Sequence, residues 1–151
     1  MRPVIRVLCG VLLAGSVLLR AQGQAQAPLP TPESVLGFQP GTDFKLATYE
    51  QVVGYYQRVD EASEHVMLVQ AGRSAQGRPY YFALVSSPEN LRRLDRYREI
   101  AQRLAHPEGL TDAEAMALAK EGKAFVHIDG GLHSTEVAAH QHTPQVLYDL
   151  L

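Results

Sequence analysis

A histidine and a glutamate three positions apart, His133 and Glu136, are the residues of this 151-residue chain best suited to chemistry. They come just after Gly130 and Gly131, and glycines let the backbone turn sharply. A neutral imidazole and a carboxylate are good ligands for Zn²⁺, and a catalytic zinc site takes three protein ligands and a water. The apolar run before the glycines ends where α/β sheets gather their ligands. The spacing therefore indicates half of a metal site.

The same spacing also fits a polar turn that caps the following helix, because a helix start favours the negative charge of Glu136. With 6 histidines in the chain, one such pair can also arise by chance. The position at a strand end, the glycine pair and the helix behind it favour the metal site.

Two further side chains, Asp129 and His140, are candidates to orient the metal ligands without contacting the ion. Asp129 ends the apolar run, where it would hold a ligating histidine or bond nearby backbone. His140 follows Glu136 by one helical turn and would share its face, either lining the crevice or completing a purely local site. His127 is expected in the core of a strand, and His142 is expected to be structural or exposed.

An α/β pattern surrounds these residues. The nearly continuous apolar run AFVHID over 124–129 predicts a central strand covered on both faces. Two more strands, joined by a glycine-containing link, are predicted over 66–70 and 80–87. Apolar spacing and capping residues predict three helices, over 49–62, 88–104 and 112–121. Thr143 and Pro144 then mark either a fresh helix or a kink in one helix.

The first residues have the layout of a secretory signal peptide. Arg2 and Arg6 give a basic start, an apolar run follows, and small residues around 25–27 resemble a cleavage site. The apolar run is shorter than the roughly 20 residues that a membrane-spanning helix needs. We expect a signal over 1–27, a secreted or periplasmic protein and no membrane span after signal cleavage. Cys9, the only cysteine, lies inside this signal.

Without the signal the chain is acidic. Removing Arg2, Arg6 and Arg20 from the 14 basic residues leaves 11 against 16 acids, a net charge of −5. An acidic surface argues against nucleic acid as a partner. Residues 28–47 are rich in Pro and Gly and predict an extended lead-in rather than a packed element.

Three stretches together resemble the zinc carboxypeptidase (metallocarboxypeptidase) family, in particular the N-terminal part of its secreted bacterial members. TYEQVVGYYQRV resembles the opening helix of the family, AGRSAQGRPYYFALVSS its G-x-S-x-x-G-R turn between two strands, and FVHIDGGLHSTE its strand leading into His-x-x-Glu. The resemblance covers about residues 45–151. It implies an α/β fold with a mixed central sheet flanked by helices, of which 48–151 would be an incomplete, N-terminal portion of the catalytic domain.

By that resemblance His133 and Glu136 are the first two zinc ligands, and Zn²⁺ is the cofactor. The third ligand and the general base of the family lie further downstream, so no catalytic residue is expected within this chain, and the chain alone is expected to be inactive. The function implied for the full-length protein is zinc-dependent hydrolysis of peptide bonds outside the cytoplasm, in a peptide or a cell-wall peptide. Thr135 stands where many members carry arginine, which leaves details of substrate binding open.

Two other functions remain open. A related zinc deacylase also uses His-x-x-Glu but acts on N-acyl amino acids; the signal and the G-x-S-x-x-G-R turn favour the peptidase. The other is a non-catalytic remnant that binds a partner, favoured by the ending LYDLL, which falls within a predicted helix. We hypothesise instead an incomplete sequence of a larger enzyme, whose exposed sheet edge predicts poor solubility.

Overall fold

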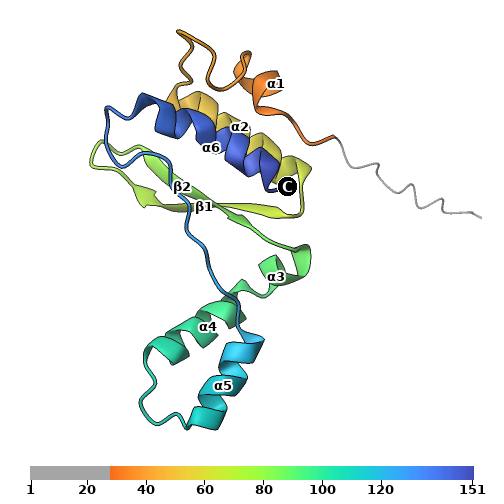
Figure 1. Cartoon of the computed structure of the whole chain (residues 1–151), viewed down its shortest axis with the longest axis vertical. Coiled ribbons are helices and arrows are strands. Elements are labelled where there is room, and N and C mark those ends of the chain that lie inside the picture. The colour runs from red at the N-terminus through yellow and green to blue at the C-terminus, as the bar shows by residue number, and fades with distance from the viewer. Residues whose placement is uncertain (1–27) are drawn as a thin grey trace, which may run out of the picture.

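The computed structural model describes residues 28–151, and the signal predicted over 1–27 lies outside the described residues. The elements are α1 (Pro32–Leu36), α2 (Tyr49–Ala62), β1 (Val66–Arg73), β2 (Pro79–Val85), α3 (Pro88–Arg92), α4 (Leu94–Ala105), α5 (Asp112–Glu121) and α6 (Val137–Asp149). Figure 1 shows a body in which α2 and α6 lie side by side over the two strands, with α4 and α5 forming a hairpin that extends away from it. The fold is therefore α/β, with a small antiparallel sheet.

The two strands pair along nearly their whole length. Val66 lies opposite Val85 and Arg73 opposite Pro79, with an irregularity in the register between Gln70 and Gly72. The predicted strands over 66–70 and 80–87 are confirmed as a pair, with slightly different ends.

The G-x-S-x-x-G-R sequence forms the turn between these strands. The Ser74 N–H donates to the Arg78 carbonyl at 2.8 Å, and the Arg78 N–H donates to Ser74 Oγ at 3.2 Å. Gly77 has a φ of +78°, a left-handed conformation that glycine adopts at little cost. The motif thus encodes a hairpin turn, which fixes where β2 begins.

Helix α2 supplies one side of the core. Thr48 and Gln51 form a capping box at its start, and Tyr55 and Val59 are fully buried. These two side chains pack with Val66 of β1 and Leu147 of α6 in one apolar cluster. The cluster joins the sheet to both helices, so it holds α6 in place.

Helix α6 continues through Pro144, so the sequence from Thr143 does not begin a new helix. Proline lacks the N–H that would bond the carbonyl of His140, four residues earlier. The hydroxyl of Thr143 donates to that carbonyl at 3.2 Å. The Thr-Pro pair therefore replaces the missing backbone bond locally, and the helix continues.

The helix predicted over 88–104 is two helices. Arg93 leaves the helical conformation with φ −108° and ψ 15°, and its N–H donates to the Asn90 carbonyl at 2.9 Å. The helix predicted over 112–121 is confirmed, and Thr111 and Glu114 form its capping box. None of the helices within 28–151 combines the length and apolar character needed to cross a bilayer.

Three sequence predictions are wrong. The central strand expected over 124–129 is absent: this segment is irregular, with Phe125 60% and Val126 83% exposed. A strand needs a neighbour to bond its backbone, and in the described part of the chain β1 and β2 pair only with each other. His127, expected in the core, is exposed for the same reason.

The lead-in over 28–47 also contains a packed element, α1, whose Leu36 is buried.

Candidate metal centre

His133 and Glu136 contact each other through both the backbone and the side chains. Glu136 is the N-cap residue of α6, and its Oε1 lies 2.5 Å from Nδ1 of His133. Its Oε2 accepts the backbone N–H of His133 at 3.1 Å, and its own N–H donates to the His133 carbonyl at 3.1 Å. The four-residue turn therefore closes on itself and fixes the carboxylate against the imidazole.

The electrostatics of the turn favour an ionised carboxylate. The bonds from the His133 side chain, and then from its backbone N–H, hold the pKa of Glu136 below its usual value. The His133 side chain is 72% exposed and that of Glu136 is 41% exposed. Both potential ligands are therefore open to solvent.

The glycines before the pair rest directly on α6. A Cβ added at Gly130 would lie 2.4 Å from the Ala139 carbonyl oxygen, and one at Gly131 would lie 2.6 Å from the Ala139 Cβ. Gly131 also has a φ of +91°, in the left-handed region. The glycine pair thus allows a close approach to α6 as well as the sharp turn predicted from the sequence.

The donor atoms fit a zinc ion. Imidazole nitrogen and carboxylate oxygen are ligands that zinc commonly takes, with bonds of roughly 2.0–2.2 Å in a tetrahedral arrangement. Two such ligands stand about 3.3 Å apart, whereas Nδ1 of His133 and Oε1 of Glu136 are 2.5 Å apart and directed at each other. The two side chains would therefore have to separate to hold an ion between them, which their exposure to solvent permits. Within residues 28–151 no group of three His, Cys, Asp or Glu side chains comes together.

The other predicted residues lie apart from this contact. Asp129 places its Oδ2 3.2 Å from Nε2 of His127, so its contact is with that histidine rather than with His133. His140 is exposed on α6, and the purely local site that would add its ring to His133 and Glu136 does not form within the described chain. His142 is exposed, and its ring lies near Gly130.

One buried polar residue near the pair was missed by the sequence reasoning. Gln141, on α6, is 5% exposed, and its Oε1 accepts the backbone N–H of Ala47 at 3.1 Å. A glutamine in a helix gives no sign that it will bond a backbone group 94 positions earlier.

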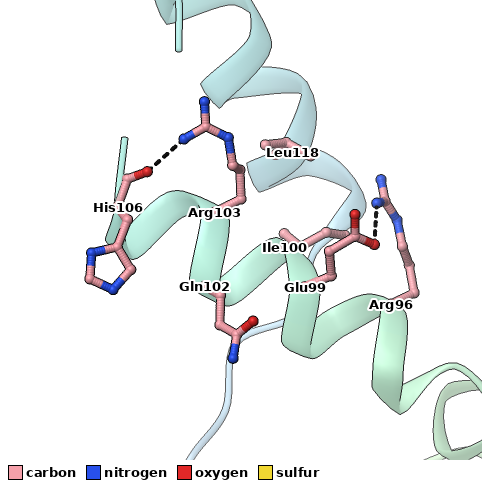
Figure 2. A pocket seen from close by; sticks show the side chains of 7 residues that line it. All are labelled: Arg96, Glu99, Ile100, Gln102, Arg103, His106 and Leu118. Atoms are coloured by element: carbon pink, nitrogen blue, oxygen red, sulfur yellow. Dashed lines mark hydrogen bonds and ion pairs between the residues drawn. The ribbon is translucent and has the colours of Figure 1, made fainter. Parts of the chain in front are cut away.

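A separate cavity of about 350 Å³ lies between α4 and α5. Figure 2 shows Ile100 and Leu118 between the helices, with polar side chains around them. The lining residues are Arg96, Glu99, Ile100, Gln102, Arg103, His106 and Leu118. None of them belongs to the turn that holds His133 and Glu136, so this cavity is not part of the candidate metal centre.

An α/β body carrying His-x-x-Glu at the start of a helix is the arrangement expected of a zinc hydrolase. A sequence profile described as zinc carboxypeptidase matches residues 52–151. The chain therefore belongs to the zinc carboxypeptidase family, which confirms the resemblance seen in the sequence. Comparisons with curated proteins and with solved structures give no significant match.

Proposed function

We propose that His133 and Glu136 supply two of the protein ligands of a catalytic Zn²⁺ in an enzyme that hydrolyses peptide bonds. The observation that carries this proposal is the 2.5 Å contact between Nδ1 of His133 and Oε1 of Glu136, in a chain of the zinc carboxypeptidase family. The exposure of both side chains leaves room for water and a substrate at the same point.

When bound, Zn²⁺ would polarise the scissile carbonyl and lower the pKa of a water molecule. His133 would contribute Nδ1 once the hydrogen bond from Nδ1 to Glu136 is released and that nitrogen carries no proton. Glu136 would contribute a negative charge that offsets that of the cation. The bond from the His133 N–H to Oε2 would keep the carboxylate oriented and leave Oε1 as the oxygen available to the ion.

The third ligand and the general base are proposed to come from residues outside 28–151. A catalytic zinc site takes three protein ligands, and the described chain brings together two. We therefore propose that this chain alone does not hydrolyse peptides, and that it forms the N-terminal portion of a larger domain with a mixed sheet. The large apolar side chains exposed over 124–129 support the larger domain, because further parts of such a domain would cover them.

The proposed substrate is a peptide or a cell-wall peptide outside the cytoplasm. The net charge of −5 without the signal argues against nucleic acid, as derived from the 11 basic and 16 acidic residues. Thr135, beside Glu136, leaves this position of the motif without a positive charge for binding a substrate carboxylate.

Zinc binding tests the pair. We expect His133→Ala and Glu136→Ala each to weaken Zn²⁺ binding to the chain by at least about tenfold in calorimetric titration. Mutating residues that only hydrogen-bond to metal ligands already lowers metal affinity by about 10–100-fold, so losing a ligand itself should cost at least as much. His127→Ala is the matched control, since His127 is an exposed histidine whose contact is with Asp129. Zinc affinity that is unchanged in both variants of the pair would show that these residues are not the ligands.

A further inference from the structure

The first half of α6 has few contacts that hold it to the body of the molecule. Glu136 stands at its start, and the side chains over 137–140 are exposed apart from the partly buried Ala139. Burial begins at Gln141 and continues at Pro144 and Leu147, three residues apart each time. Gln141 is therefore the buried contact of α6 nearest in sequence to His133 and Glu136, the metal pair (the two proposed zinc ligands).

The contact made by Gln141 is a directional one. Its Oε1 accepts the N–H of Ala47, which is itself only 6% exposed. The next residue, Thr48, caps α2. A single buried hydrogen bond thus joins Ala47, just before the N-cap of α2, to the second turn of α6.

A glutamine at this place carries a cost that an apolar residue would avoid. Its Nε2 is buried without a hydrogen-bond partner, which destabilises a folded protein. A methionine of similar size would remove that orphan donor but would leave the N–H of Ala47 unpaired. The hydrogen bond also fixes the rotation of α6 about its axis, because hydrogen bonds weaken steeply as they leave alignment. The apolar contacts of Pro144 and Leu147 are less directional.

The metal pair depends on that same half of α6. Gly130 and Gly131 rest on the helix at Ala139, within one turn of Gln141. We propose that Gln141 is a positioning residue for the pair: its bond to Ala47 sets where the start of α6 holds Glu136, and through it the ring of His133. This assignment rests on the proposed function, and it adds a residue that touches neither the metal nor the substrate.

Gln141→Met tests the assignment, with Leu147→Val as the matched control. The first removes the acceptor while keeping the volume; the second removes a methylene from the same buried face and leaves the bond to Ala47 intact. Three quantities are compared on the whole chain at one pH: the Zn²⁺ dissociation constant, the ¹⁵N shifts of the His133 ring and the melting temperature. We expect Gln141→Met to weaken zinc binding about tenfold and to move the His133 shifts, whereas Leu147→Val lowers the melting temperature and changes zinc affinity less than about twofold.

Equal loss of zinc affinity in the two variants, or no change in Gln141→Met, would overturn the assignment. If the unmodified chain binds no zinc, the proposed ligand role of His133 and Glu136 fails. The His133 ring shifts then decide the second question by themselves: unchanged shifts in Gln141→Met would refute the positioning role of Gln141. If Gln141→Met does not fold, the same measurements are made on Ala47→Pro, which removes the donor of the bond, against Ala47→Gly, which keeps it. Equal zinc affinity and equal shifts in those two variants would also refute it.

Discussion

At the scale of single residues, the two glycines before the metal pair have separate reasons to be glycine. Gly130 lies where a side chain would collide with the carbonyl of Ala139, and also with Thr143, whose Cγ2 would be 2.5 Å from the added Cβ. Gly131 adds a left-handed φ of +91° to a similar collision. Backbone that approaches a helix this closely has no room for alanine.

Alanine substitution distinguishes the glycine required before the metal-binding pair from an ordinary glycine within a helix. We expect Gly131→Ala to lower the free energy of unfolding by about 1–3 kcal/mol, the usual cost of a strained backbone conformation. Gly54→Ala, inside α2 with open space around it, is expected to raise it by about 0.5–1 kcal/mol. Urea denaturation of both variants measures these changes, and a Gly131→Ala protein as stable as the unmodified chain would contradict the packing described.

The sequence predicted that His133 and Glu136 lie together because the information is local. His133 and Glu136 are three positions apart, and the turn that joins them is made by their own atoms. The bond from Ala47 to Gln141 could not be predicted, because it depends on how two distant helices pack. The contact of Asp129 with His127 could not be foreseen either, since it follows from the absence of a strand at that point.

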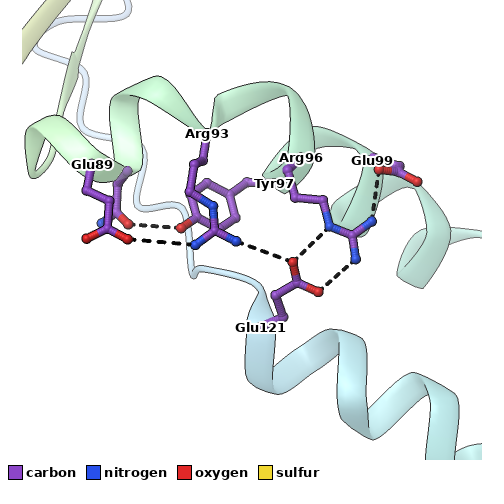
Figure 3. A network of polar contacts seen from close by, with 7 residues as sticks. Glu89, Arg93, Arg96, Tyr97, Glu99 and Glu121 are labelled. Carbon is purple, nitrogen blue, oxygen red and sulfur yellow. Dashed lines mark hydrogen bonds and ion pairs between the residues drawn. The ribbon is translucent and has the colours of Figure 1, made fainter.

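At the scale of elements, the shortest ion pair between α4 and α5 joins Arg96 to Glu121. Figure 3 shows the Arg96 guanidinium facing Glu121, with Nε 2.8 Å from Oε1 and Nη2 2.7 Å from Oε2. Arg93 adds a longer contact of 3.4 Å to the same carboxylate and lies over the ring of Tyr97. Arg96 also binds Glu99, on its own helix, at 2.9 Å.

This network makes the pairing of α4 and α5 sensitive to acid. The hydrogen bonds from Arg96, followed by its charge, hold the pKa of Glu121 below its usual value. A group with a lowered folded pKa contributes stability above its unfolded pKa and loses that contribution as the pH falls through the folded pKa. We therefore expect the protection of the α5 amides, measured against their intrinsic exchange rates, to fall below the ordinary pKa range of glutamate.

Two substitutions isolate the contribution of Glu121. Glu121→Gln should remove most of the acid dependence of α5 exchange and raise exchange already at neutral pH. Glu99→Gln removes a bond to the same arginine within α4 and should leave the α5 profile unchanged. Identical profiles for the two variants would mean that the contact between α4 and α5 does not depend on this ion pair.

The helices were easier to predict than the sheet. Thr48 with Gln51 and Thr111 with Glu114 start their helices by bonds within four residues, so their sequences contain the necessary signal. The break at Arg93 was not predicted, because the apolar spacing continues through it. The run over 124–129 was predicted as a strand from its composition, whereas a strand forms only where another strand lies beside it.

At the scale of the whole molecule, the segment over 124–129 links the α4–α5 hairpin to the body (Figure 1). In the described chain its backbone makes none of the turn, loop or ladder hydrogen bonds found elsewhere. We expect its amides to exchange with solvent within seconds, while the paired amides of β1 remain protected for much longer. Slow exchange over 124–129 would show that this segment is paired after all.

The same measurement tests the proposal of a larger sheet. In a longer form of the protein that includes the proposed third ligand, the amides over 124–129 should become as protected as those of β1. Exchange that stays fast in the longer form would contradict a central strand at this position.

The bond between Ala47 and Gln141 also bears on the order in which the elements assemble. The β1–β2 hairpin and the α4–α5 hairpin each join neighbours in the chain, so they close short loops and can form early. The Ala47–Gln141 bond closes a loop of 94 positions, which carries a larger entropy cost. During synthesis α2 leaves the ribosome long before α6, and the α4–α5 hairpin emerges between them. We therefore expect α6, with Glu136 at its start, to dock on the body late in folding, whereas the turn between His133 and Glu136 is local and can form by itself.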